Sequence, residues 1–268
     1  MFQIKGKILY NKKVKGSYFH LALEAPDIAK ESLPGQFLNI KVSNTYEPLL
    51  RRPLSIHSVR GRNIEVLYEV VGKGTKVLSE KGPGEVLDVI GPLGNGFTFN
   101  SWAHGLAGSR TILIGGGMGV APLVFLADKI AGLRARGTKF KAQVLIGAKT
   151  KGNIICEKEF KDLGCSVKSA TDDGSYGFKG RITDLLKNIL RSASYDLPIT
   201  IYACGPRLML KEISAISRKY GIPAQISLEE HMACGIGACL GCVVNTKQGL
   251  RRVCKDGPVF NADEINWK

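Results

Sequence analysis

The sequence predicts a multidomain α+β protein in three parts: a β-barrel, an α/β domain with a parallel sheet, and a small C-terminal domain built around cysteines. Residues 1–101 contain short runs of strand-forming residues between turns, and residues 102–226 alternate strands with helices. Residues 227–268 hold four of the seven cysteines. A chain of 268 residues with 44% hydrophobic content is long enough to bury about two substantial cores.

The first part is predicted to be a barrel because glycine, proline and asparagine turns separate its apolar runs. Many short strands joined by such turns are typical of barrels and sandwiches. The expected strands are residues 2–10, 17–23, 36–42, 52–59, 64–71 and 86–90.

Two motifs in this part favour a dinucleotide. The first consists of Arg52, Pro53, Leu54 and Ser55. Its guanidinium can hold a diphosphate while the hydroxyl and backbone groups face a ring system. The second is Gly74 with Thr75, before a helix expected over residues 76–81, where exposed backbone amides attract phosphate. Each has a simpler interpretation: a strand with a surface arginine, and a turn with a helix cap.

The second part changes to a pattern of apolar strands separated by helices, which indicates a parallel sheet covered on both faces. Ligands of such sheets bind beyond the C-terminal ends of the strands. The expected strands are residues 111–114, 143–146, 166–170, 199–203 and 224–228. The expected helices are residues 121–136, 157–163, 183–190 and 207–220.

A glycine run follows the first of these strands and consists of Gly115, Gly116, Gly117, Met118 and Gly119. It departs from the G-x-G-x-x-G fingerprint, because Val120 stands where the third glycine is needed and no acidic residue ends the second strand. What remains is a strand, a flexible turn and a helix with Pro122 in its first turn, which suits a diphosphate. The alternative is a tight turn without a ligand.

Two further strand ends carry candidate ligand contacts. Cys204, Gly205 and Pro206 end the fourth strand of this part, where the thiol would lie over the ligand crevice. Thr171 and Asp172 end the preceding strand and could contact a ribose. The alternatives are a small buried cysteine and an ordinary polar turn.

The C-terminal cysteines have the spacing C-x4-C-x2-C followed by one distant cysteine, and they are Cys234, Cys239, Cys242 and Cys254. This is the spacing of a plant-type [2Fe-2S] site, in which four thiolates hold two bridged irons. Structural zinc is the main alternative, although its ligands usually come from two short knuckles and only Cys239 and Cys242 form one. Disulfides are disfavoured by the odd cysteine count. An iron–sulfur protein of this kind would move single electrons.

The net charge of +15 raises the question of nucleic-acid or membrane binding. Lysine and arginine are spread along the chain without a basic run or an interleaved aromatic platform, which disfavours nucleic acid. The N-terminus lacks the apolar run of a signal peptide, and no stretch reaches the roughly 18 apolar residues of a spanning helix. We therefore expect a cytoplasmic protein without membrane contact.

Together these motifs resemble those of the ferredoxin-NADP reductase superfamily, whose members pair an FAD-binding β-barrel with a pyridine-nucleotide domain. The cysteine segment narrows the resemblance to the family of electron transfer subunits of NAD-dependent (type B) dihydroorotate dehydrogenases, and the similarity covers essentially the whole chain. The most specific part is residues 227–239. The resemblance implies an FAD-binding barrel over 1–101, an NAD-binding domain over 102–226 and a [2Fe-2S] domain over 227–268.

The resemblance also implies roles for individual residues. The [2Fe-2S] cluster would be ligated by the four cysteines, and the glycine run would hold the NAD diphosphate. Cys204 would lie near nicotinamide and is the predicted catalytic residue. Leu54 departs from the wider superfamily, which often has tyrosine there, so an aromatic ring over the flavin is not implied. FAD would be bound by Arg52, Pro53, Leu54, Ser55, Glu69, Val70, Val71, Gly74 and Thr75.

The implied partner is an FMN-containing dihydroorotate dehydrogenase catalytic subunit, in a heterotetramer with two copies of each chain. Electrons from FMN would pass through the cluster and FAD to NAD+ during de novo pyrimidine biosynthesis. The choice of NAD over NADP rests on the resemblance. The residues alone leave it open, because Lys149 at the end of the second strand could equally contact a phosphate. The alternatives are the small subunit of a ferredoxin-NADP reductase, hydrogenase or sulfide dehydrogenase complex, and a zinc-stabilised nucleic-acid-binding module.

Overall fold

A computed structural model describes residues 1–99, 110–135, 141–192 and 198–267. The chain forms two compact units. The first contains Met1–Gly96, Glu230–Val244 and Leu250–Pro258, and the second contains Phe97–Glu229, Asn245–Gly249 and Val259–Lys268. The expected boundary between residues 101 and 102 and the expected helix end at Arg136 lie outside the described residues.

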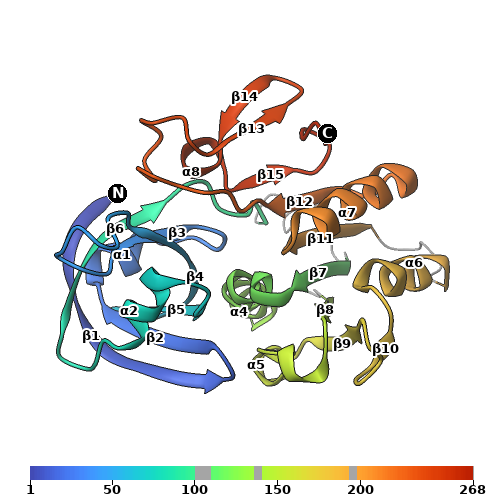
Figure 1. The fold of residues 1–268 in the computed structure, drawn as a ribbon. Helices are drawn as coiled ribbons and strands as arrows, with labels where there is room; N and C mark the ends of the chain where they lie inside the picture. The colour runs from blue at the N-terminus through green and yellow to red at the C-terminus, as the bar shows by residue number, and fades with distance from the viewer. Residues whose placement is uncertain (100–109, 136–140, 193–197, 268) are drawn as a thin grey trace. The chain divides into compact units, whose positions relative to one another are not determined.

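The first unit is built on a closed six-stranded barrel with the strand order β1-β2-β5-β4-β3-β6 (Figure 1). Alternating side chains fill its interior, and Leu21, Leu23, Leu38, Ile40 and Val66 are fully buried. All six expected strands are present. Their bounds are β1 Phe2–Lys15, β2 Tyr18–Glu24, β3 Phe37–Lys41, β4 Arg52–Arg60, β5 Asn63–Glu69 and β6 Val86–Leu93.

Two short helices accompany the barrel. Helix α1 (Pro26–Glu31) was not anticipated, and α2 covers Lys73–Ser79 instead of the expected residues 76–81. The early start follows from Thr75, whose hydroxyl oxygen accepts hydrogen bonds from the backbone amides of Val71 and Gly72. Gly74 and Thr75 therefore belong to the first turn of α2 and do not precede the helix.

The second unit contains a seven-stranded sheet in the order β10-β9-β8-β7-β11-β12-β15. The pairs from β10 to β12 are parallel, whereas β15 adds an antiparallel edge. Central positions such as Ile112, Ile114, Val144 and Ile146 are almost completely buried, as in a sheet covered on both faces. The strands are β7 Arg110–Gly116, β8 Lys141–Ala148, β9 Ser166–Thr171, β10 Phe178–Lys179, β11 Ile199–Cys204, β12 Ala224–Ser227 and β15 Val259–Asn261.

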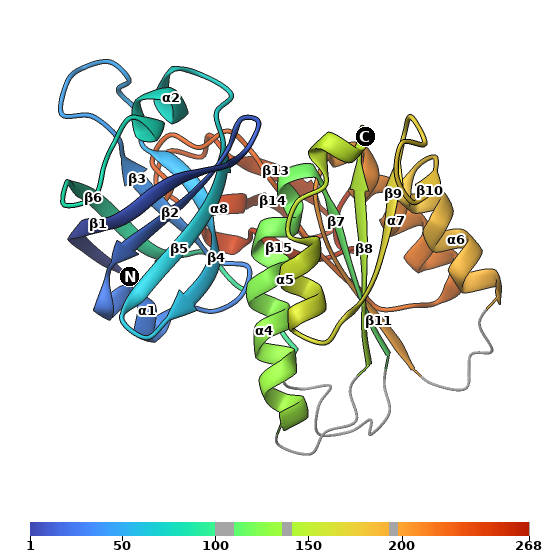
Figure 2. The ribbon, with the colours of Figure 1, turned by 90° about the horizontal axis from the view of Figure 1, so that it is seen from below.

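Helices cover both faces of this sheet. Figure 2 shows α4 and α5 on one face and α6 and α7 on the other. Right-handed crossovers through such helices are the usual way to join parallel strands. In the described part of this unit, the strands and helices expected from the sequence are confirmed to within two residues at each end. The helices are η1 Gly117–Val120, α4 Ala121–Ala135, η2 Lys151–Asn153, α5 Glu157–Asp162, α6 Ile182–Ser192 and α7 Arg207–Tyr220.

The C-terminal segment contributes to both units. Its hairpin, β13 (Val243–Thr246) with β14 (Gly249–Arg252), leads into the short helix α8 (Val253–Asp256). The cysteine loop from residue 230 onward belongs to the barrel unit, where the amide of Asn95 donates to the carbonyl of Gly257 at 2.5 Å.

None of the described helices combines the length and apolar character that crossing a bilayer requires.

Candidate functional site

The four C-terminal cysteines lie in the barrel unit, with backbone amides directed at their sulfur atoms. The amides of Ile236 and Cys239 lie 3.5 Å and 3.4 Å from the Sγ of Cys234. The amide of Gly241 lies 3.5 Å from Cys239 Sγ, and the amide of Cys254 lies 3.4 Å from Cys242 Sγ. Such hydrogen bonds stabilise negative charge on sulfur and help to set the potential of an iron–sulfur cluster.

The sulfur atoms form two pairs. The Cys234 and Cys239 thiols are within hydrogen-bonding reach of each other, and so are the Cys242 and Cys254 thiols. In the described part of the chain, no group of three or more potential ligand atoms within 4.8 Å of one another includes these cysteines. A tetrahedral zinc site would bring all four sulfurs to roughly 3.8 Å from one another, given Zn–S bonds of about 2.3 Å. Two pairs of thiols instead fit two irons, each with two thiolate ligands.

The ionisation of the loop agrees with a metal-ligating role. Burial opposes ionisation of Cys234, but the amides of Ile236, Cys239 and Ala238 and the Cys239 thiol together outweigh it and lower its pKa to about 6. Burial and the neighbouring Cys242 thiol raise the pKa of Cys254 to about 12. Cys234 is therefore thiolate at neutral pH, whereas metal loading must displace the proton of Cys254.

Side chains outside the loop hold its carbonyl groups. The Asn39 amide donates to the Cys234 oxygen at 3.1 Å, and Arg252 donates to the Gly237 oxygen at 3.0 Å. Arg252 is itself fixed by Asp256, whose Oδ2 lies 3.0 Å from Nε. Neither Asn39 nor Arg252 was predicted from the sequence, because neither belongs to the cysteine spacing.

The two expected flavin motifs meet in the barrel unit. A Cβ atom added to Gly74 would overlap the guanidinium of Arg52, so this side chain lies directly on the first turn of α2. Glycine permits this close approach, and a larger residue would require the guanidinium to move. Lys73 of the same turn pairs with Glu47, and Arg52 also donates to the carbonyl of Leu50. The geometry places a cation beside the N-terminal turn of a helix, an arrangement that suits phosphate.

The other expected flavin residues lie on β4 and around the end of β5. Ser55 and Leu54 are half-buried on β4, whose Arg52–Ser55 segment pairs with β3. Glu69 ends β5 and accepts a hydrogen bond from the Ser17 hydroxyl at 3.0 Å, while Val71 is 78% exposed. Their contacts with a flavin stay a prediction.

The glycine run and the Cys204-Gly205-Pro206 motif pack together in the second unit. A Cβ on Gly119 would overlap the carbonyl of Cys204, and one on Gly116 would lie 2.9 Å from Pro206 Cδ. Both motifs therefore lie at the C-terminal ends of β7 and β11, which are neighbours in the sheet. This is the edge where nucleotides bind in such folds.

Cys204 itself is a neutral thiol. Burial, with a smaller contribution from the Glu229 charge, raises its pKa to about 12. A thiol protonated at neutral pH is a poor nucleophile, which favours a packing or positioning role over nucleophilic chemistry. Its role beside nicotinamide stays a prediction.

Thr171 and Asp172 differ in their surroundings. The Thr171 hydroxyl is buried and exchanges hydrogen bonds with the backbone of Tyr176, at 2.9 Å to the oxygen and 3.0 Å from the amide. It holds the turn after β9, as the simpler interpretation expected. Asp172 is exposed at the same strand end, and its ribose contact stays a prediction.

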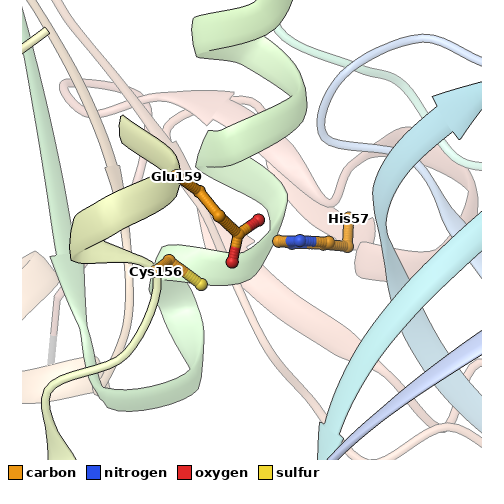
Figure 3. A group of neighbouring side chains, drawn as sticks. All are labelled: His57, Cys156 and Glu159. Atoms are coloured by element: carbon orange, nitrogen blue, oxygen red, sulfur yellow. The ribbon is translucent and has the colours of Figure 1, made fainter. Parts of the chain in front are cut away.

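A pair of neighbouring titratable side chains outside these motifs was not anticipated. Cys156 has a left-handed backbone conformation (φ 61°) immediately before α5, and Glu159 on α5 lies beside it (Figure 3). Burial and the Glu159 carboxylate raise the pKa of Cys156 well above its usual value. His57, also drawn in Figure 3, is a buried residue of β4.

The closed barrel, the parallel sheet with its glycine turn and the paired cysteines define an electron-transferring oxidoreductase of the ferredoxin-NADP reductase class. Residues 113–215 match the oxidoreductase NAD-binding domain, and residues 229–266 match the iron-sulfur cluster binding domain of dihydroorotate dehydrogenase B. The chain belongs to the family of dihydroorotate dehydrogenase B (NAD(+)) electron transfer subunits.

Curated relatives support this assignment over the full length. The electron transfer subunit of Desulforamulus reducens is 40% identical over 98% of this chain and 97% of its own. The subunit of Geobacillus thermodenitrificans is 42% identical over 92% of each chain.

Solved structures agree. An NADH-dependent reduced ferredoxin-NADP oxidoreductase is 30% identical, with a TM-score of 0.83 over 98% of this chain and 90% of that one. A ferredoxin NADP+ reductase from Neisseria gonorrhoeae shares the fold alone, at 17% identity and a TM-score of 0.68 over 82% of this chain and 92% of its own.

Proposed function

We propose that this chain is the electron transfer subunit of an NAD-dependent dihydroorotate dehydrogenase. It would take electrons from FMN of a catalytic subunit and deliver them through a [2Fe-2S] cluster and FAD to NAD+, in de novo pyrimidine biosynthesis. The partner would be the FMN-containing catalytic subunit, in a cytoplasmic heterotetramer of two copies of each chain. The names of the full-length relatives support this partner and reaction.

The observation that carries the proposal is the place of β3 in the barrel unit. Asn39 of β3 pairs with Pro53 of the flavin motif and also donates to the Cys234 carbonyl. The two cofactor motifs are therefore attached to neighbouring strands of one unit. When bound, the cluster supplies one-electron transfer, and the flavin converts one-electron steps into a hydride for NAD+.

The residues of this chain would hold and orient these groups. Cys234, Cys239, Cys242 and Cys254 would ligate the cluster, and Arg52 with the first turn of α2 would neutralise the FAD diphosphate. Leu54, Ser55, Glu69, Val70 and Val71 would complete the flavin site. The turn from Gly115 to Gly119 would admit the NAD diphosphate, with Cys204, Gly205 and Pro206 beside nicotinamide and Asp172 near a ribose.

The test is co-expression with a dihydroorotate dehydrogenase catalytic subunit, followed by anaerobic purification. We expect a stable complex that contains iron, FAD and FMN and reduces NAD+ when dihydroorotate is added. A chain that purifies with zinc but without iron or flavin would refute the proposal. Size-exclusion chromatography with light scattering tests the heterotetramer.

A second candidate function is supported by the similarity to the reduced ferredoxin-NADP oxidoreductase. In that case the chain would serve a different large subunit and exchange electrons with ferredoxin. The same preparation separates the two, because reduced ferredoxin and dihydroorotate can be offered in parallel with NAD+ and NADP+. Activity with ferredoxin but not with dihydroorotate would favour the second candidate.

A further inference from the structure

We propose that Asn39 is a positioning residue for the cluster ligand Cys234, and that its side-chain amide fixes the loop whose backbone amides face the ligand sulfur. The inference rests on the proposed function, because it assigns a role toward the cluster. It concerns a barrel residue nearly 200 positions before the cysteine that it holds.

Asn39 lies in the middle of β3 and is 0% exposed. Its neighbours Leu38 and Ile40 are also fully buried, and strand geometry directs them to the opposite face from Asn39. The Asn39 side chain therefore leaves the barrel interior and reaches the cysteine loop, where Nδ2 donates to the Cys234 oxygen at 3.1 Å.

The fit between the two segments is close. Gly235 follows Cys234 with a φ of +70°, and a Cβ atom at this position would overlap the Asn39 amide. Glycine is therefore required both for the left-handed backbone and for the approach of Asn39. A loop that merely packed on the barrel would not need both conditions at one residue.

The hydrogen bond acts on the orientation of the loop. Asn39 holds the Cys234 carbonyl and Arg252 holds the Gly237 carbonyl, while the amides of Ile236 and Cys239 point to Cys234 Sγ. Because each peptide group is planar, holding the Cys234 oxygen also fixes the N–H of Gly235, the residue directly before Ile236. Without Asn39, this first peptide of the loop can rotate, and the Ile236 amide that follows it loses its alignment with the Cys234 sulfur.

The second polar atom of Asn39 argues against a role in barrel stability. Its Oδ1 is buried and has no hydrogen-bond partner in the described part of the chain. A buried acceptor without a donor destabilises the folded state, so an apolar side chain of similar volume would suit the barrel at least as well. The amide is explained by what it does for the cysteine loop.

The test compares Asn39→Leu with Asn11→Leu in the complete complex. Asn11 is a matched control, because its Nδ2 also holds backbone carbonyls, those of Leu78 and Lys81 at 2.8 Å and 3.0 Å. Its Oδ1 accepts a hydrogen bond from the Tyr68 hydroxyl at 3.0 Å, so its side-chain hydrogen bonds join β1 to β5 and to the end of α2. The readouts are the electron paramagnetic resonance spectrum of the reduced cluster, its midpoint potential, the rate of iron loss to a chelator, and the thermal midpoint.

For Asn39→Leu we expect a changed spectrum, a lower midpoint potential, and iron loss about tenfold faster, without a lower thermal midpoint. For Asn11→Leu we expect a lower thermal midpoint with an unchanged spectrum and potential. Asn39→Asp, which keeps the shape but loses the donor, should reproduce the cluster defects and serves if Asn39→Leu does not fold.

The outcomes separate this inference from the proposed function. Wild-type protein without a [2Fe-2S] spectrum would overturn the proposed function. Wild-type protein with the cluster, and Asn39 variants with the same spectrum, potential and iron-loss rate, would overturn the role of Asn39 alone. Cluster defects that appear equally in Asn11→Leu would also overturn it, because they would report general loosening of the barrel.

Discussion

Asn39 and Cys234 are joined by a hydrogen bond of 3.1 Å from the Asn39 side-chain amide to the Cys234 carbonyl. Asn39 is also the strand partner of Pro53 in the expected flavin motif. One buried residue therefore connects the strand that would carry FAD with the loop that would carry the cluster. A rigid link of this kind suits electron transfer, because two cofactors held by one unit keep a constant separation.

The cluster ligands can be separated from the nucleotide site by mutation. Cys239→Ser should abolish electron transfer that depends on the partner and spare most oxidation of NADH by artificial two-electron acceptors. Cys165→Ala, at a buried cysteine outside the cluster loop, is the control and should retain both activities. Steady-state assays with each acceptor provide the measurement, and equal loss of both activities in Cys239→Ser would contradict a separate cluster role.

The close contact between Gly119 and Cys204 predicts sensitivity of the nucleotide site. Gly119→Ala should displace the end of β11 and weaken NADH binding by about tenfold or more, which corresponds to about 1.4 kcal/mol. Gly132→Ala on α4 is the control, because nothing lies within 4 Å of its added Cβ, and it should stabilise the protein by up to about 1 kcal/mol. Isothermal titration and thermal unfolding test both, and tight NADH binding by Gly119→Ala would refute the assignment.

The flavin motif can be tested through a glycine. Gly74→Ala should push Arg52 away from the first turn of α2 and reduce FAD affinity by about tenfold or more. Gly72→Ala, two residues earlier, meets no atom within 4 Å and should retain FAD. Fluorescence titration of the flavin-free protein measures both affinities, and equal affinities would remove Arg52 from the site.

The barrel contains a carboxylate whose ionisation should make stability pH-dependent. The His20 side chain lowers the pKa of Glu65 to about 2, against an opposing effect of burial and with further help from Ser58 and Tyr10. Because the folded pKa lies below the ordinary value of 4.5, the stabilisation is present above about pH 4.5 and is lost as the pH falls towards 2.

Glu65→Gln should therefore unfold more easily than wild type at pH 6, by about 2 kcal/mol after allowance for solvent screening. The difference should shrink by pH 3. Glu80→Gln is the control, because the Glu80 side chain is 60% exposed and forms a surface ion pair with Lys76. Urea unfolding at both pH values tests this, and a constant difference between wild type and Glu65→Gln would contradict it.

Much of the architecture was predictable because local patterns repeat. Turn residues between short apolar runs predicted the six barrel strands, and alternating strands and helices predicted the parallel sheet. The cysteine spacing predicted the cluster loop, since its chemistry depends on residue type and spacing over a short segment. Short elements carry weaker local signals, and helix α1 and strands β10, β13, β14 and β15 were among those not anticipated. Helix α2 began three residues earlier than expected because of the Thr75 cap.

The sequence by itself determined which groups are available: four thiols at cluster spacing, an arginine on a strand, and glycine turns at strand ends. Only the tertiary structure decided which of them meet. It paired the sulfurs of Cys234 and Cys239, laid Arg52 on Gly74, and brought Asn39 to the Cys234 carbonyl. These contacts join segments far apart in the chain, and they depend on strand order and register, which no local pattern encodes.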